Sequence, residues 1–327
     1  MDNSQDAIQS EETISTAASL PAEISEPSAQ EASAQEASVF PAPPTTMDPG
    51  IKPSDCKGCS GGDGPALVYA LGQLDYDFGT EARRDSFLQH GISNPHDPAA
   101  MLDYLSNNPA HATAVTWTLV QEATPIYAIH PAGPFAAEIY ATLREFLSGQ
   151  IKDGVERVSI PGVTGSSATL LNGQKVPLIV PELRGLYSWS TGALVEAVAG
   201  EQPKDDAGKR EHAAKVEEIA NFLERIYYEI RNLGITQQDR AMNYAATNAF
   251  QIESVVTAAL AEGLKLDGID VERSPVCRPE SDCWDVKLTF FNPKKRLEEA
   301  RKVYRFTIDV SDVVPVTVGP VRSWHVY

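Results

Sequence analysis

The four cysteines are the residues whose type and spacing most directly suggest a chemical role. Cys56 and Cys59 form a C-x-x-C pair in a glycine-rich stretch, and Cys277 and Cys283 flank the segment RPESD. Zinc favours four soft ligands, and two cysteine pairs from distant segments can build a structural zinc site. Three interpretations stay open: one zinc site shared by the four thiols, two separate reduced or redox-labile pairs, or disulfides.

A second group of reactive side chains lies in the stretch 75–85. Carboxylates and guanidinium groups are dense enough there to suggest acid–base chemistry, with the candidates Asp75, Asp77, Glu81, Arg83 and Arg84. The alternative is that these charges pair with one another where a strand ends and a helix begins. The DFG sequence at 77–79 does not indicate a kinase, because no glycine-rich loop, strand lysine or HRD sequence accompanies it.

The usual catalytic signatures are missing from the sequence. It contains no HExxH, no GxSxG and no phosphate-binding lysine loop. None of the six histidines sits in a recognisable nucleophile context. We therefore expect no catalytic residue and no cofactor other than the zinc considered above, although an enzyme with unrecorded chemistry stays the alternative hypothesis.

Composition excludes several classes of partner. The chain has 327 residues and a net charge of −18, and such an acidic surface repels the phosphates of nucleic acids. No stretch approaches the roughly 20 apolar residues that a membrane-spanning helix needs. The N-terminus lacks the basic and apolar regions of a secretory signal. We expect a cytoplasmic protein that binds neither nucleic acid nor membrane.

The chain divides into three parts by composition. Residues 1–63 are rich in Ser, Ala, Glu and Pro, which predicts a disordered acidic tail or linker. An N-terminal mixed α/β subdomain is expected over 64–200. The C-terminal subdomain over 201–327 is expected to hold an antiparallel helix pair, joined at Gly234 and Thr236, and then an antiparallel β-sheet. Blocks of helices and strands without a repeated βα rhythm indicate the α+β class.

Local signals predict several element boundaries. Thr80 is expected to cap the helix after the first strand, and Gly149 to end a helix over 135–149. Two strand segments are expected to break near Pro125. Asn172-Gly173 is typical of a hairpin turn. Strands are expected at 155–160, 168–171 and 175–180, and in the stretches GIDVERSPV, CWDVKLTFF, VYRFTIDV and VPVTVGPVRSWHVY.

Four longer stretches carry a family resemblance: YALGQLDYDFGTEARRDSF, ELRGLYSWSTGALV, RIYYEIRNLGITQQDRAMNYAATNAFQ and CWDVKLTFFNPKKRLEEARKVYRFTIDVSDVVPVTVGPVRSWHVY. Over roughly residues 64–327 the chain resembles the C-terminal domain of the PatG- and PatA-type cyanobactin maturation proteases. In that family the domain follows a subtilisin-like protease and belongs to the machinery that turns ribosomal precursor peptides into macrocycles. The domain has no assigned reaction, so the resemblance implies no catalytic residues. We expect a free-standing or excised domain without the parent's proteolytic activity.

The resemblance implies an accessory, non-catalytic module that binds the precursor peptide or a partner maturation enzyme. The edge of the C-terminal sheet is expected to accept an extended peptide as an added strand. The candidate contact residues are Trp284, Trp324, Tyr327, Arg83 and Arg84. Plain core packing is the alternative for the aromatic residues. Homodimerisation through the helix pair is a further expectation, and the enzyme alternative is isomerisation of residues near heterocycles.

Overall fold

The computed structural model describes residues 65–190, 192, 212–213, 216–217, 231–247, 255, 258–259, 262–295 and 298–327. These residues all belong to one compact unit, Phe40–Tyr327. The tail predicted over 1–63 and most of the first helix of the predicted pair lie outside the described residues. None of the helices described is long and apolar enough to cross a membrane.

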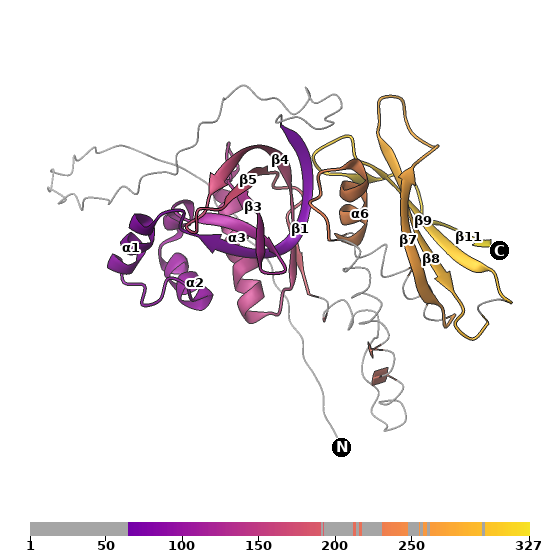
Figure 1. Ribbon diagram of the computed structural model, residues 1–327, viewed down its shortest axis with the longest axis horizontal. Helices are drawn as coiled ribbons and strands as arrows, with labels where there is room; N and C mark the ends of the chain where they lie inside the picture. Colours follow the sequence, from indigo (N-terminus) through magenta and orange to yellow (C-terminus); the bar gives the residue numbers. More distant parts are fainter. Residues whose placement is uncertain are drawn as a thin grey trace, which may run out of the picture. The chain divides into compact units, whose positions relative to one another are not determined.

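The N-terminal part of the described chain is built around a β-barrel. Its strands are β1 (Ala66–Asp77), β2 (Thr116–Gln121), β3 (Thr124–Ile129), β4 (Arg157–Thr169), β5 (Lys175–Pro181) and β6 (Tyr187–Trp189). The first half of β1 pairs with β4 and its second half with β2, so the order β1-β2-β3-β5-β4 closes on itself (Figure 1). β6 adds beside β4.

One parallel pair fixes the topology of this barrel. β3 and β5 run parallel, whereas the other strand pairs are antiparallel. The crossover between β3 and β4 contains the helix α3 (Ala136–Lys152), whose buried Leu143 and Phe146 join the barrel core. This closed five-stranded arrangement is that of an OB-type Greek-key barrel. The helices α1 (Glu81–Gln89) and α2 (Pro98–Asn107) are inserted between β1 and β2.

The predicted local boundaries are confirmed where a cap or a tight turn sets them. The Thr80 hydroxyl accepts a hydrogen bond from the Arg83 N–H at 3.3 Å and so caps α1. Gly173 has φ +84° in the turn between β4 and β5. The break predicted near Pro125 lies earlier, because Glu122 and Ala123 form the turn with φ +47° and +63°. Pro125 itself lies inside β3.

Two predicted boundaries are wrong for a shared physical reason. The strands expected at 155–160 and 168–171 are one continuous strand, β4. Gly162 inside it is not a break but a close approach, since an added Cβ would lie 2.3 Å from the Val180 carbonyl oxygen. Likewise α3 continues past Gly149 to Lys152, and a Cβ at Gly149 would lie 2.8 Å from a Val155 methyl group.

The C-terminal part contains one helix and a second sheet within the described residues. They are α6 (Gln237–Thr247), β7 (Lys265–Arg273), β8 (Cys283–Phe291), β9 (Arg301–Asp309), β10 (Val316–Thr317) and β11 (Arg322–Val326). The strand order is β10-β9-β8-β7, β11 also pairs with β9, and each pairing is antiparallel. The described helices and strands do not alternate in a regular βα order and the strand pairs are almost all antiparallel, which confirms the α+β class.

A short segment before α6 joins this second part to the barrel. The Tyr69 N–H donates to the Gly234 carbonyl at 2.9 Å, and the Tyr69 carbonyl accepts from the Asn243 side-chain amide at 2.8 Å. The Tyr127 hydroxyl donates to the Leu233 carbonyl at 2.7 Å. Because Asn243 is fully buried, its hydrogen bonds are costly to lose.

Apolar packing surrounds these hydrogen bonds. One core cluster combines Tyr69 and Leu71 of β1 with Ala241 and Ala245 of α6 and with Phe306 of β9. The odd-numbered β1 residues therefore pack against α6, whereas the even-numbered Val68 and Ala70 belong to the barrel core. β1 is buried on both faces, which explains its nearly continuous apolar sequence.

We predict that Gly234→Ala destabilises the fold by about 3 kcal/mol or more. An alanine there must adopt φ +69° and would place its Cβ 2.2 Å from the Tyr69 carbonyl oxygen. Gly173→Ala is the matched control, because it has the same backbone strain but nothing within 4 Å of the new Cβ. It should cost about 1 kcal/mol. Urea unfolding measures both, and equal losses would contradict the proposed role of Gly234.

Candidate functional site

Among the described strands, β11 forms an open edge of the C-terminal sheet, on the same side of β9 as the short strand β10. Successive residues of β9 direct their backbone hydrogen bonds alternately to the neighbouring strand on one side and to the strands on the other side. The Val310 N–H donates to the Asp282 carbonyl, so even-numbered residues of β9 bond to β8. The Thr307 carbonyl accepts from Val318 on the other side. Odd-numbered residues of β9 therefore bond toward β10 and β11.

The register of β11 then fixes which of its backbone groups are open. Arg322, Trp324 and Val326 lie opposite odd-numbered residues of β9 and use their backbone groups to bond to it. Ser323 and His325 consequently turn their N–H and C=O groups away from the sheet. In the described part of the chain no strand pairs with that side of β11. It is an exposed template for an extended peptide.

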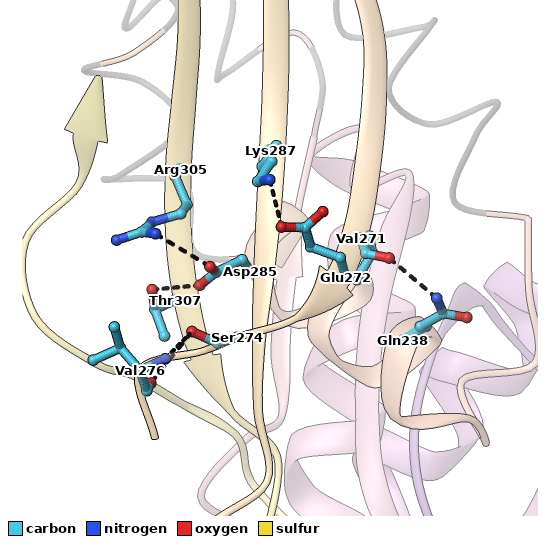
Figure 2. A network of polar contacts seen from close by, with 9 residues as sticks. All are labelled: Gln238, Val271, Glu272, Ser274, Val276, Asp285, Lys287, Arg305 and Thr307. Carbon is cyan, nitrogen blue, oxygen red and sulfur yellow. Dashed lines mark hydrogen bonds and ion pairs between the residues drawn. The ribbon is translucent and has the colours of Figure 1, made fainter. Parts of the chain in front are cut away.

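The opposite edge of the sheet is partly closed. The Ser274 N–H donates to the Cys283 carbonyl, so even-numbered residues of β7 bond to β8 and odd-numbered ones point outward. The outward Val271 carbonyl accepts a hydrogen bond from the Gln238 side chain of α6 at 3.1 Å (Figure 2). Asp270 and Glu272 add exposed charge to this strand, a common protection of sheet edges.

We call the face of this sheet that points away from α6 the outer face. The face toward α6 carries the apolar residues Val286, Leu288 and Phe306, whereas polar residues alternate with them on the outer face. Figure 2 shows two rows of contacts there. Lys287 of β8 pairs with Glu272 of β7 at 2.5 Å, and both side chains are partly exposed.

The second row contains a buried carboxylate. Asp285 is fully buried, accepts a hydrogen bond from the Thr307 hydroxyl at 2.6 Å, and pairs with the Arg305 guanidinium at 3.3 Å. The Arg305 guanidinium also lies over the Trp324 ring, 5.9 Å from its centroid, which is within cation–π range. This row links β8, β9 and β11 across the outer face.

Comparison with known proteins places the chain in a family. Two family models match, one described as PatG C-terminal over residues 209–324 and one described as PatG Domain over residues 67–170. A solved structure described as a PatG Domain of Unknown Function is 41% identical with a TM-score of 0.72; the match covers 81% of this chain and 100% of that chain. The chain belongs to the family of PatG C-terminal domains. The search of curated proteins gave no significant match.

The aromatic residues predicted to bind a partner fall in different environments of this PatG-type domain. Trp284 is partly buried, packs against the apolar core and donates to the Asp282 carboxylate at 3.0 Å. Trp324 lies on the outer face under Arg305. Tyr327 is fully exposed next to β11. Trp324 and Tyr327 thus lie beside the open edge, whereas Trp284 packs against the apolar core.

The charged residues predicted near the first strand hold the junction between β1 and α1. The Asp77 carboxylate accepts hydrogen bonds from the Gly79 and Leu171 N–H groups at 2.6 and 2.8 Å. Arg83 donates to the Phe78 carbonyl at 2.8 Å, and Arg84 pairs with Asp85 at 3.0 Å. These contacts match the structural alternative, in which the charges join a strand to a helix.

Asp75 and Glu81 complete this group. Burial raises the pKa of Asp75 above its ordinary value, and the nearby Asp77 carboxylate adds to the shift. Asp75 accepts a hydrogen bond from the Tyr76 N–H. Glu81 lies in the first turn of α1, where a negative charge favours the helix dipole. Among the described residues no contact joins this group to Trp324 or Tyr327, which lie at the C-terminal sheet.

The predicted cysteine site is described only in part. Cys56 and Cys59 lie outside the described residues. Cys277 is exposed and Cys283 is buried at the start of β8. The Cys277 thiol donates to the Ser281 carbonyl at 3.1 Å. Among the described residues no group of three or more His, Cys, Asp or Glu is arranged to hold a metal. Zinc therefore stays a prediction that depends on the first pair.

Sequence reasoning missed the residues that define the open edge. Ser323 and His325 contribute the outward N–H and C=O groups of the edge. Arg305 and Arg322 lie opposite each other because of the register between β9 and β11. The signal available was the polar character of the segment 322–326, whose residues are charged or polar at most positions. That pattern is typical of a strand exposed at a sheet edge.

We predict that Asp285→Ala destabilises the domain by about 2–3 kcal/mol, because it leaves the largely buried Arg305 without its counter-charge. Glu272→Ala is the matched control, since it removes one partner of an ion pair on the same face whose acid is 55% exposed. That change should cost less than about 1 kcal/mol. Urea unfolding of both variants measures the difference, and similar values would contradict the role assigned to the buried row.

The two described thiols should differ in reactivity. Burial, together with the Cys277 thiol and the Asp309 charge, raises the pKa of Cys283 to about 12, so it stays protonated through mildly alkaline pH. Native alkylation at pH 8 should modify Cys277 rapidly and Cys283 only on unfolding, as peptide mass mapping reports. Zinc bound by all four thiols would instead protect Cys277 and give about one zinc per chain in metal analysis.

Proposed function

We propose that this PatG-type domain is an accessory, non-catalytic module of cyanobactin maturation that binds an extended segment of the precursor peptide. The peptide pairs with β11 as an added strand of the C-terminal sheet. Because the precursor is made on ribosomes, the proposed place of action is the cytoplasm. Family membership supports the pathway, and the peptide is the substrate that members of such a pathway share.

The open edge of β11 is the observation that carries this proposal. Ser323 and His325 direct two N–H and two C=O groups outward, and an extended peptide can satisfy all of them. The other edge is less suitable, because Gln238 already occupies the Val271 carbonyl. The exposed Tyr327 and the half-exposed Trp324 lie next to the open edge and can contact peptide side chains.

The barrel offers a weaker candidate surface. OB-type barrels commonly bind ligands on the side formed by their second and third strands. Here the segment before α6 occupies part of that region, since Gln121 of β2 donates to the Asn232 carbonyl and Tyr127 of β3 to the Leu233 carbonyl. The net charge of −18 also opposes oligonucleotide binding. The C-terminal sheet is therefore the better choice.

A proline scan of the edge tests the proposal. We predict that His325→Pro weakens binding about tenfold, because it removes an outward N–H while leaving the bonds between β11 and β9 intact. Ser323→Pro should act alike. His325→Ala, which keeps the N–H, should bind within about twofold of the wild type. The measurement is fluorescence polarisation with short overlapping peptides that together span the precursor.

The same mixtures distinguish the alternatives. Unchanged affinity of both proline variants, with unchanged unfolding temperatures, would show that the peptide does not pair with β11. Binding by no peptide would remove the precursor as the partner and favour a maturation enzyme. Mass spectrometry of each mixture after incubation tests the enzyme hypothesis, because isomerisation alters chromatographic retention and other modifications alter mass.

A further inference from the structure

Two arginines face each other across β9 and β11. The register places Arg305 directly opposite Arg322. Both side chains lie on the outer face, and in a hydrogen-bonded antiparallel pair the Cα atoms are only about 5.5 Å apart. Like charges in this position destabilise a sheet unless a counter-charge lies nearby. The position therefore calls for an anionic group.

The two carboxylates described on the outer face, Asp285 and Glu272, pair with other basic residues and not with Arg322. Asp285 pairs with Arg305, and Glu272 pairs with Lys287. Arg322 is exposed, and none of the described acids lies within ion-pair distance of it. Figure 2 shows that one terminal nitrogen of Arg305 points toward Asp285 while the other points away from it. Among the described residues, no hydrogen-bond partner or ion pair is found for that second nitrogen.

Trp324 holds Arg305 in position for such a ligand. Its ring lies 5.9 Å below the guanidinium, and Trp324 is the next residue of β11 on the same face as Arg322. A guanidinium that is stacked on an aromatic ring presents its N–H edge to a carboxylate in a fixed orientation. Two arginines so arranged can share the two oxygens of one carboxylate.

The local charge balance also suits an acidic ligand. Residues 262–327 contain eleven basic and eleven acidic residues, so this part is neutral although the whole chain has a net charge of −18. The negative charge of the chain therefore lies outside the C-terminal sheet. A carboxylate approaching β11 meets an uncompensated arginine rather than a surplus of acids.

We infer that Arg305 and Arg322 form a carboxylate-binding site that selects an extended peptide with a Glu or Asp side chain on the outer face, opposite Arg322. The inference rests on the proposed strand addition, because alternate side chains of a strand paired with β11 lie on this face. It adds a sequence requirement to that binding mode: the recognised segment is acidic at this position.

A synthetic host peptide tests the inference independently of the precursor. The probe is an alternating Thr-Val peptide, capped at both ends, with Glu, Gln or Lys at its centre. Because its sequence repeats, the peptide can pair with β11 in several registers, and the central residue selects the register of lowest free energy. The wild-type domain should bind the Glu peptide about fivefold tighter than the Gln peptide, and the Lys peptide weakest.

Substitutions of Arg322 assign the preference to this site. Arg322→Gln should remove the preference for Glu, and Arg322→Glu should reverse it in favour of Lys. Arg273→Gln on the opposite edge β7 is the matched control, because it removes the same charge from an exposed position of the same sheet. It should leave the order Glu, Gln, Lys unchanged. Arg305 is not substituted, since its ion pair with Asp285 supports the sheet.

The outcomes separate this inference from the proposed function. Equal binding of the three peptides, abolished by His325→Pro, would overturn the carboxylate site and keep strand addition. A Glu preference that Arg322→Gln leaves intact would also overturn it. Selective binding of the Glu peptide without binding of any precursor segment would support the site and overturn the choice of partner. Binding of no host peptide would overturn both.

Discussion

The arrangement of the described chain depends on how the backbone of Tyr69 is satisfied. Its N–H and carbonyl are turned away from β4 and are bound by Gly234 and Asn243, from a segment far along the chain. A buried backbone group without a partner is costly, so these two bonds fix the position of α6 against β1. Only glycine fits the approach at 234. The sheet that carries the open edge is thus joined to the barrel by these polar contacts and by the apolar cluster that β1, α6 and the sheet share.

The two faces and the two edges of the C-terminal sheet lie in different environments. One face packs against α6 and β1, one edge is partly closed by Gln238, and the outer face holds a buried ion pair between Asp285 and Arg305. Such a pair contributes little net stability compared with apolar packing, but it fixes the side chains that share it. Here it orients Arg305, and through Trp324 it links β9 to the edge strand. The linked contacts of Asp285, Arg305 and Trp324 on the outer face therefore reach the edge strand β11.

Sequence reasoning succeeded where the cause was local. Thr80 caps α1 and the Asn172-Gly173 turn joins two strands because each conformation depends on a few neighbouring residues. It failed where a small residue permits a distant contact. Gly162 lies between the two strands expected at 155–160 and 168–171, yet it lets β4 pass close to the backbone of β5. Chain closure into a barrel depends on such approaches, which no local pattern reveals.

The candidate site was predictable only in outline. The family resemblance and the terminal strands favoured a sheet edge, and the polarity of 322–326 agrees with it. The register between β8, β9 and β11 determines which backbone groups of β11 point outward. The same register places Arg305 opposite Arg322. Trp284 shows the converse difficulty. A tryptophan at this position suggested a binding residue. Trp284 lies on the same face of β8 as Val286 and Leu288, however, and packs against the core.

The partial closure of β7 by Gln238 also bears on how copies of the domain can assemble. A sheet with two open edges can add neighbours at both ends and grow into an open polymer. In the described part of the chain, Gln238 of α6 occupies the Val271 carbonyl of β7, so this edge is partly blocked for an added strand, whereas no strand pairs with the outward side of β11. One glutamine side chain thereby makes β7 a poorer site for strand addition than β11, and unequal edges are less suited to the growth of an open polymer.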